Sequence, residues 1–279
     1  MIKIGMMIGG RYELLEKIGI GGTSEVYKVK DFKLNRFGAA KILKQEFSIN
    51  GDFISKFRME AQIAAGIMHP NIIDVYDAGE EDGIFYIVME LVEGITLKNY
   101  IGRKGRLSLR EAVSIAVQVA MGVGAAHNNQ IIHRDIKPQN IIISKGGMVK
   151  VMDFGIAKTV AGSMITSTVM GSVYYISPEQ ASGGCSDEQS DIYSLGITIF
   201  KMLTGKVPFS GETAVDIAVK HIREELPSLR EYVPEIPDRV EQIIFRCCQK
   251  SPNRRYQSMQ ELIMDLKQSL VSLDDDFVE

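Results

Sequence analysis

One stretch of the 279-residue chain reads His133-Arg134-Asp135-Ile136-Lys137-Pro138-Gln139-Asn140, and Asp153-Phe154-Gly155 begins thirteen residues after Asn140. Two short apolar runs, 141–143 and 148–152, lie between them on either side of a glycine-containing turn, which predicts a β-hairpin. Because strand pairing brings the open ends of a hairpin together, we expect Asn140 and Asp153 to lie side by side. Hard oxygen ligands at one place suit Mg²⁺, which completes its shell with phosphate oxygens and water. The stretch therefore suits phosphoryl transfer.

The order His-Arg-Asp-x-Lys-Pro-x-Asn, then Asp-Phe-Gly, resembles the catalytic loop and metal-binding segment of eukaryotic-type protein kinases. The resemblance implies an α+β, two-lobed fold, with a small antiparallel β lobe that holds one main helix and a larger, mainly helical lobe. It also implies that Asp135 accepts the proton of the acceptor hydroxyl, that Lys137 steadies the transferring phosphoryl group, and that Asn140 and Asp153 hold the metal. A merely polar loop is the alternative, and so many fixed residue types at fixed spacing speak against it.

A glycine-rich loop lies upstream at 19–26 and is a weak signal by itself. Segments 12–18 and 26–29 on its two sides both read as strands, whereas a dinucleotide-binding fingerprint needs a helix after the loop. We therefore expect a hairpin flap whose glycines let backbone N–H groups approach phosphates, with Ser24 in place of the usual third glycine. The resemblance assigns ATP binding to Ile18, Gly19, Ile20, Gly21, Gly22, Val26 and, beyond the catalytic loop, Ile142.

The segment Gly38-Ala39-Ala40-Lys41 occupies the place of the family's strand with the phosphate-binding lysine. The resemblance implies that Lys41 contacts the α- and β-phosphates and that Ala39 lies against the adenine. Apolar residues recur close to a 3.6-residue period over 52–67, which predicts a helix. Glu60 lies inside that helix, and its match to the family's third helix makes it the expected partner of Lys41. A solvated glutamate is the alternative.

The apolar run 85–92 ends at Glu93-Gly94 and resembles the segment that connects the two kinase lobes. The resemblance makes Met89 the residue beside the adenine and assigns the adenine hydrogen bonds to the carbonyl of Glu90 and the backbone of Val92. ATP and Mg²⁺ are the implied cofactors, with Mn²⁺ as an alternative metal.

Segment 171–179 matches the end of the kinase activation segment. The resemblance implies that Ser172 bonds near Asp135 and Lys137 and helps to accept a Ser or Thr substrate. It pairs Glu179 with Arg255 as a buried ion pair, which is costly to break from one side.

Two apolar helices are expected in the larger lobe. Asp191 begins an apolar run that ends at Leu203 and should form the central helix, and the resemblance ties Asp191 to the catalytic loop from below. Ser108 and Glu111 form a capping box ahead of a second run at 112–126, which is short of the roughly 20 residues that span a bilayer and reads as a buried helix.

Arg134 places a cation beside the expected catalytic base, and the loop beyond Asp153 is rich in hydroxyls. A phosphate there would add about −1.5 to −2 charge and could pair with Arg134. We therefore expect autophosphorylation at Thr166 or Thr168. A hydroxyl-rich loop that is simply exposed is the alternative.

Composition bounds the remaining possibilities. With 45% hydrophobic residues the chain can bury a large core, and its net charge of −3 gives no reason to expect nucleic-acid binding or membrane contact. Its three cysteines are too few for a disulfide framework and favour a reducing, cytoplasmic setting. The expected organisation is a leader (1–10), the small lobe (11–93), the helical lobe (94–270) and an acidic tail (271–279).

The position of Lys137 and several short segments resemble bacterial Ser/Thr kinases of the PASTA-receptor group, whose intact chains carry a membrane span and extracellular repeats. We therefore expect a Ser/Thr protein kinase acting on protein substrates, either as the cytoplasmic domain of such a receptor or as a soluble enzyme. A homodimer through the small lobe is expected by analogy only. A pseudokinase that binds ATP without catalysis and a small-molecule kinase of related fold are the alternatives.

Overall fold

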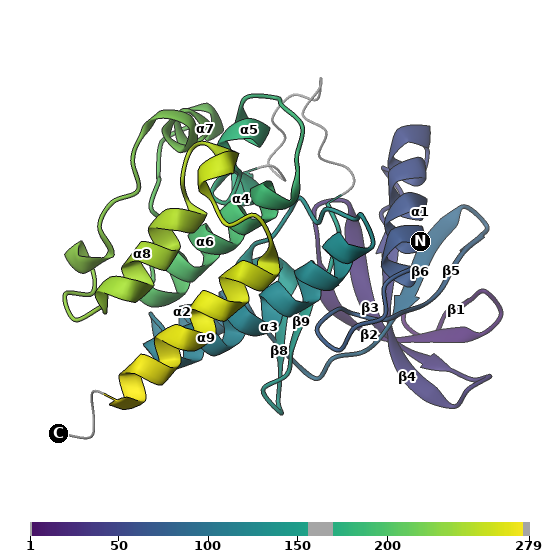
Figure 1. The fold of residues 1–279 in the computed structure, drawn as a ribbon. Coiled ribbons are helices and arrows are strands. Elements are labelled where there is room, and N and C mark those ends of the chain that lie inside the picture. Colours follow the sequence, from purple (N-terminus) through teal and green to yellow (C-terminus); the bar gives the residue numbers. More distant parts are fainter. Residues whose placement is uncertain (1, 156–169, 276–279) are drawn as a thin grey trace. The chain divides into compact units, whose positions relative to one another are not determined.

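The computed structural model describes residues 2–155 and 170–275. The chain divides into two compact units, Met1–Glu93 and Gly94–Glu279, and passes from one to the other between Glu93 and Gly94 (Figure 1). The expected phosphorylation sites Thr166 and Thr168 lie outside the described residues.

The first unit contains one antiparallel sheet with the strand order β1-β2-β3-β4-β6-β5 (Figure 1). Its elements are β1 (Met7–Ile8), β2 (Tyr12–Ile20), β3 (Ser24–Asp31), β4 (Arg36–Leu43), α1 (Gly51–Ala65), β5 (Val75–Glu81) and β6 (Ile84–Met89). Strand β4 lies between β3 and β6, and its last six residues are buried, as expected for a central strand. Helix α1 begins at the N-cap Asn50, whose side chain accepts from the backbone N–H of Asp52. The predicted helix at 52–67 is confirmed, with slightly different ends.

Part of the segment 1–10, which we expected to be a leader, belongs to this sheet. Met7 and Ile8 pair with Glu13 and Tyr12, and Ile8 is fully buried in a cluster with Tyr12 and Leu14. Burial of the Ile8 side chain stabilises the pairing of this short strand. The glycine- and methionine-containing sequence around Ile8 does not indicate a strand.

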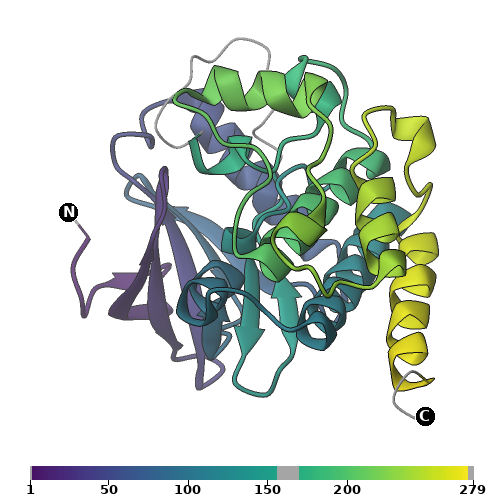
Figure 2. The same ribbon diagram turned by 90° about the vertical axis from the view of Figure 1, so that its left-hand side faces the viewer.

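The second unit is mainly helical and contains a small antiparallel sheet, β7-β8-β9. Its longer elements are β7 (Gly94–Thr96), α2 (Leu97–Lys104), α3 (Leu109–Asn128), β8 (Ile141–Ser144), β9 (Val149–Val151), α4 (Met170–Val173), α5 (Pro178–Ala181), α6 (Glu188–Thr204), α7 (Ala214–Arg223), α8 (Asp238–Cys247) and α9 (Met259–Asp275). Three single turns of 3-10 helix lie at Pro138–Asn140, Leu229–Glu231 and Pro252–Arg254. Strands β8 and β9 pair Ile141 with Val151, so the predicted hairpin is confirmed, and they lie side by side in Figure 2.

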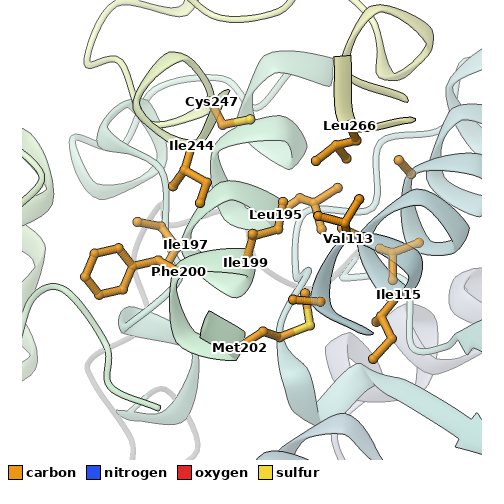
Figure 3. Close-up of a cluster of buried hydrophobic side chains, with 14 of the residues drawn as sticks. Val113, Ile115, Leu195, Ile197, Ile199, Phe200, Met202, Ile244, Cys247 and Leu266 are labelled. Atoms are coloured by element: carbon orange, nitrogen blue, oxygen red, sulfur yellow. The ribbon is translucent and has the colours of Figure 1, made fainter. Parts of the chain in front are cut away.

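Helix α6 is the centre of the second unit. Side chains from α3, α8 and α9 pack around Leu195, Ile197 and Phe200 of α6 (Figure 3). A helix that is apolar on nearly all sides is stable only inside a protein, and α6 is buried along almost its whole length. At Gly196 an added Cβ would lie 2.6 Å from the Cβ of Cys247, so the glycine permits the close approach of α6 and α8. The predicted central helix is confirmed.

Helix α3 is also a core helix. Its capping box is present, with the Ser108 side chain accepting from the Glu111 backbone and the Glu111 carboxylate accepting from the Ser108 backbone. By length and composition α3 is the one described helix that could cross a membrane, but 56% of its apolar window is buried inside the protein. Its contacts with α6 and α9 show that this apolarity serves the core.

Candidate active site

The segment that contains Asp135 is anchored by one buried carboxylate. Asp191, on the first turn of α6, is fully buried and accepts from the backbone N–H of His133 and of Arg134, each at 2.8 Å. The imidazole Nε2 of His127, at the end of α3, lies 2.8 Å from the same carboxylate. Burial of a carboxylate is costly unless hydrogen bonds replace its water, and these three contacts do so. The contact of Asp191 with the backbone of the 133–140 segment, which the family resemblance implied, is therefore present in the structure.

The backbone of this loop is strained at Arg134. Arg134 has a φ of 65°, a conformation that costs a non-glycine residue of order 1–3 kcal/mol. Two hydrogen bonds hold Arg134 in this conformation. Asp191 accepts from the Arg134 N–H, and Gln180 Nε2 donates to the Arg134 carbonyl at 3.2 Å. Gln180 is itself fixed in the capping box of α5 by the buried Ser177.

His133 positions Asp135 as a neutral ring. Burial lowers the pKa of His133 below its ordinary value, in spite of the carboxylates of Asp191 and Asp135 nearby. Its Nδ1 accepts from the backbone N–H of Asp135 at 3.2 Å, which leaves Nε2–H to donate to the carbonyl of Met152 at 3.1 Å. The ring also packs against Phe154 in a tilted arrangement, with centroids 4.8 Å apart, which fixes its orientation.

Asp135, Lys137 and Ser172 meet at one ammonium group. Lys137 Nζ donates to Asp135 Oδ2 at 2.7 Å and to Ser172 Oγ at 2.7 Å. Asn140 Nδ2 donates to the backbone carbonyl of Asp135 at 2.9 Å and to its Oδ2 at 3.0 Å. The Lys137 ammonium and the Asn140 amide thus orient the carboxylate of Asp135. The hydroxyl of Ser172 contacts the same ammonium.

The hairpin carries Asn140 and Asp153 to the same end. The backbone N–H of Met152 donates to the carbonyl of Asn140 at 2.9 Å, which continues the β8–β9 pairing to the residue just before Asp153. Asp153 has a φ of 59°, and the chain turns there toward Gly155, whose N–H donates to the carbonyl of His133 at 2.7 Å. An added Cβ at Gly155 would lie 2.8 Å from the Cβ of Asp135, so only glycine fits this approach.

The donor chemistry of Asn140 and Asp153 fits a hard divalent ion. Among residues 2–155 and 170–275 no group of three or more His, Cys, Asp and Glu side chains is placed to hold a metal. Mg²⁺ does not require such a cage, because it is commonly bound by one or two protein oxygens together with substrate phosphates and water. The two side chains therefore suit a metal that arrives with a phosphate ligand.

The first unit holds a second charged pair. Lys41 Nζ lies 2.5 Å from Glu60 Oε1, with side chains only 11% and 21% exposed. Lys41 is on the central strand β4, opposite Val26 on β3 and Ile87 on β6, and Glu60 is on α1. The predicted pairing of the two residues is present in the structure.

The glycine-rich loop joins β2 and β3 as a hairpin, as predicted. Gly19 pairs with Val26, and Gly21 N–H donates to the carbonyl of Ser24 at 2.7 Å. Ser24 is buried, which explains why a small residue replaces the usual glycine there. Ile18 and Ile20 lie at the end of β2, just before the turn that contains Gly22, and are 45% and 72% exposed.

Two of the expected adenine-contacting residues are neighbours in the sheet of the first unit. Ala39 and Met89 pair directly across β4 and β6, and both are buried. An added Cβ at Gly38 would lie 3.2 Å from the Met89 carbonyl, so the small side chain lets the strands pair closely. Glu90 N–H donates to the carbonyl of Asp74 at 2.9 Å, and Val92 follows two residues later. In the second unit, Ile142 lies on β8 between Thr96 and Lys150.

Glu179 and Arg255 form a two-pronged ion pair. The Arg255 side chain is fully buried, and its two terminal nitrogens donate to the two Glu179 oxygens at 2.8 Å each. Burial alone would raise the pKa of Glu179, but hydrogen bonds from Arg255 and Ser190 outweigh it and lower the pKa below its ordinary value. The predicted ion pair therefore anchors the end of the activation segment.

Three contacts escaped the sequence analysis. The contact of His127 with Asp191 could have been suspected, because a polar residue at the end of an apolar helix is a signal for a buried partner. Gln180 directly follows the motif that ends at Glu179, and its contact with the Arg134 carbonyl has no signal in the sequence. Lys44 Nζ donates to the Gly22 carbonyl at 2.8 Å, and nothing in the sequence near Lys44 indicated this contact with the glycine-rich loop.

The fold and these residues define a protein kinase domain. The family model described as "Protein kinase domain" matches residues 12–266, so the chain belongs to this family. The expected resemblance to bacterial Ser/Thr kinases is confirmed by curated relatives. Serine/threonine-protein kinase PrkC of Bacillus subtilis (strain 168) is 49% identical over 95% of this chain and 41% of its own length. Serine/threonine-protein kinase PknB of Mycobacterium tuberculosis (strain ATCC 25177 / H37Ra) is 40% identical over 93% of this chain and 43% of its own length.

Solved structures confirm the predicted fold class. The kinase domain of Mycobacterium tuberculosis PknI matches with a TM-score of 0.78 and 25% identity, over 97% of this chain and 99% of that domain. The chain spans about two fifths of the length of the curated relatives it matches.

Proposed function

We propose that this chain transfers the γ-phosphate of ATP to Ser and Thr hydroxyls of protein substrates. The observation that carries the proposal is the ammonium of Lys137, which lies 2.7 Å from both Asp135 Oδ2 and Ser172 Oγ. A carboxylate and a hydroxyl that both lie within hydrogen-bond distance of one cation suit transfer to a hydroxyl group.

The proposed reaction is a direct displacement. The acceptor hydroxyl oxygen forms a bond to the γ-phosphorus, the bond from that phosphorus to the β–γ bridging oxygen breaks, and ADP leaves. Asp135 takes the proton of the acceptor hydroxyl, and Lys137 stabilises the negative charge of the phosphoryl oxygens. Mg²⁺, or Mn²⁺ in its place, would be held by Asn140 and Asp153 and would neutralise phosphate charge.

The residues of the first unit are proposed to bind ATP. The lysine of the Lys41–Glu60 pair suits the α- and β-phosphates, because Glu60 fixes its extended side chain. The backbone of the glycine-rich loop suits the remaining phosphate oxygens. Ala39, Met89, Glu90 and Val92 are the proposed adenine-binding residues of this unit. Ile142 of the second unit is a further proposed ATP-binding residue.

Asp135→Asn should lower phosphate transfer by at least about 10²-fold, because the amide cannot accept the hydroxyl proton. ATP affinity should change little, since the proposed phosphate and adenine contacts remain. The measurement is transfer of labelled phosphate to a Ser/Thr peptide, with ATP binding measured by calorimetry. Asp82→Asn is a matched control, because Asp82 lies in the β5–β6 turn with a φ of 50° that asparagine tolerates.

Two outcomes would contradict this assignment. Wild-type protein that binds MgATP but phosphorylates neither itself nor a peptide would make the chain an ATP-binding module. Preferential phosphorylation of small hydroxylated compounds over peptides would make it a small-molecule kinase.

We further propose autophosphorylation at Thr166 or Thr168. Arg134 supports this proposal. It directly precedes Asp135, and its guanidinium can pair with a phosphate.

Incubation with Mg²⁺ and ATP should add phosphate to wild type but not to Asp135→Asn, and the double variant Thr166→Ala/Thr168→Ala should lose most of it. Intact mass and phosphopeptide mapping give the readout. Absence of phosphate between residues 159 and 168 would refute the proposal.

We also propose that two copies of the chain form a homodimer through an apolar surface of the first unit. The β3–β4 turn and the start of β4 expose three large apolar side chains, with Phe32 59%, Leu34 55% and Phe37 51% exposed. Apolar side chains gathered at one exposed place commonly mark a protein interface.

Leu34→Asp should shift the chain toward monomer, because a carboxylate would be buried at the contact. Sedimentation velocity across a concentration series measures the shift. Met68→Asp, at a 90% exposed position elsewhere in the same unit, is the control. Equal sedimentation of wild type and Leu34→Asp at every concentration would exclude this surface.

We place the proposed activity in the cytoplasm. Of the three cysteines, Cys247 and Cys248 are buried, Cys185 is exposed, and all are free thiols. Burial raises the pKa of Cys248 to about 12, so this thiol is inert. Free thiols agree with a reducing compartment.

A further inference from the structure

Lys44 contacts the turn of the glycine-rich loop at two points. Its side-chain Nζ donates to the carbonyl of Gly22 at 2.8 Å, and its backbone N–H donates to the carbonyl of Thr23 at 2.9 Å. Gly21 and Gly22 are exposed and contribute no side-chain packing to the turn. The two bonds from Lys44 therefore hold two successive carbonyl groups of a segment that its glycines make intrinsically flexible.

The backbone of Lys44 is itself held on both sides. Lys44 directly follows the central strand β4, whose last residue, Leu43, pairs with β3. The carbonyl of Lys44 accepts from the backbone N–H groups of Phe47 and Ser48 at 2.9 and 3.1 Å. Lys44 therefore ties the glycine-rich turn to the strand that carries Lys41.

The nearby carboxylate of Glu25 does not compete for the ammonium of Lys44. Its Oε1 accepts from Lys17 Nζ at 2.8 Å, and its Oε2 accepts from the Tyr27 hydroxyl at 2.6 Å. These hydrogen bonds and, to a smaller extent, the charge of Lys44 lower the pKa of Glu25 below its ordinary value. Because both oxygens of Glu25 have partners, the Lys44 ammonium is left for the Gly22 carbonyl.

The carbonyl groups that Lys44 holds set the direction of a neighbouring N–H group. In a trans peptide the C=O and the N–H point to opposite sides, and the described peptide bonds are all trans. A Gly22 carbonyl directed at Lys44 therefore turns the Thr23 N–H away from Lys44. Within residues 2–155 and 170–275 the Thr23 N–H has no backbone acceptor. It can donate to an anion, as N–H groups of glycine-rich turns do to phosphate.

We infer that Lys44 is a positioning residue for the phosphates of ATP. Its two bonds hold the turn in the conformation in which the Thr23 N–H can donate to a phosphate oxygen. Without the ammonium, the peptide group between Gly22 and Thr23 is free to rotate, and ATP has to order it on binding. The inference rests on the proposed ATP-dependent function and adds to it a residue outside the sequence motifs.

The test compares three variants for binding of a non-hydrolysable ATP analogue with Mg²⁺ and of adenosine, both by calorimetry. Lys44→Met removes the ammonium and keeps the length of the side chain, and Lys44→Arg keeps a cationic donor. Lys3→Met is the matched control, because it removes the same charge from an exposed position of the same unit.

Lys44→Met should raise the Kd of the ATP analogue about fivefold, the order expected for one lost hydrogen bond. It should leave the Kd of adenosine unchanged, since adenosine has no phosphates, and this also shows that the fold is kept. Lys44→Arg should recover most of the loss, and Lys3→Met should change neither Kd.

Backbone NMR order parameters of the nucleotide-free protein separate positioning from a direct contact between the ammonium and a phosphate. In Lys44→Met the values at the Gly22 and Thr23 amides should fall below about 0.6, the range of flexible backbone, and in Lys44→Arg they should stay near the wild-type values. A direct contact with phosphate would leave them unchanged in Lys44→Met.

Three results would overturn the inference alone: an unchanged Kd of the ATP analogue in Lys44→Met, an equal rise of both Kd values, or unchanged order parameters at Gly22 and Thr23. Wild-type protein that binds neither the ATP analogue nor adenosine would instead overturn the proposed function, and the inference with it.

Discussion

The buried carboxylate of Asp191 is the constraint on which the second unit depends. A carboxylate without water needs several donors, and here the donors are two consecutive backbone amides of the catalytic loop and one imidazole. The carboxylate and the loop depend on each other. The loop satisfies the charge, and the charge holds Arg134 in a backbone conformation that the residue would otherwise avoid.

The N-terminal half of α6 serves the neighbouring segments as well. Ser190 donates to Glu179 at 2.6 Å, Ser194 donates to the Tyr175 carbonyl at 2.8 Å, and Tyr193 contacts His221. Residues three or four apart on a helix lie on one face, so a few side chains of α6 hold the loop at 133–134, the backbone at Tyr175 and the Glu179–Arg255 ion pair together. The apolar packing around the rest of α6 supplies the rigid base that such positioning needs.

Much of this arrangement could be predicted because it is local or carried by motifs. The β8–β9 hairpin follows from two apolar runs and a glycine turn, and Ser108 with Glu111 marks the start of α3. The proximity of Lys41 to Glu60 and of Glu179 to Arg255 followed from the family resemblance, although their roles remain proposals. The rest depends on tertiary contacts without a local signal. Burial of Ile8, the contact of His127 with Asp191 across 64 residues, and the burial of His221 are visible only in the folded chain.

Native-state hydrogen exchange at the amides of His133 and Arg134 tests the central role of Asp191 most directly. In Asp191→Asn one acceptor oxygen is replaced by an NH₂ group, so at least one of the two amides should exchange about tenfold faster or more. Amides of Ile197 and Ile199 in α6 should keep their protection, which shows that the helix remains folded. If both loop amides exchange as slowly as in the wild type while phosphate transfer is retained, the carboxylate of Asp191 does not hold the catalytic loop.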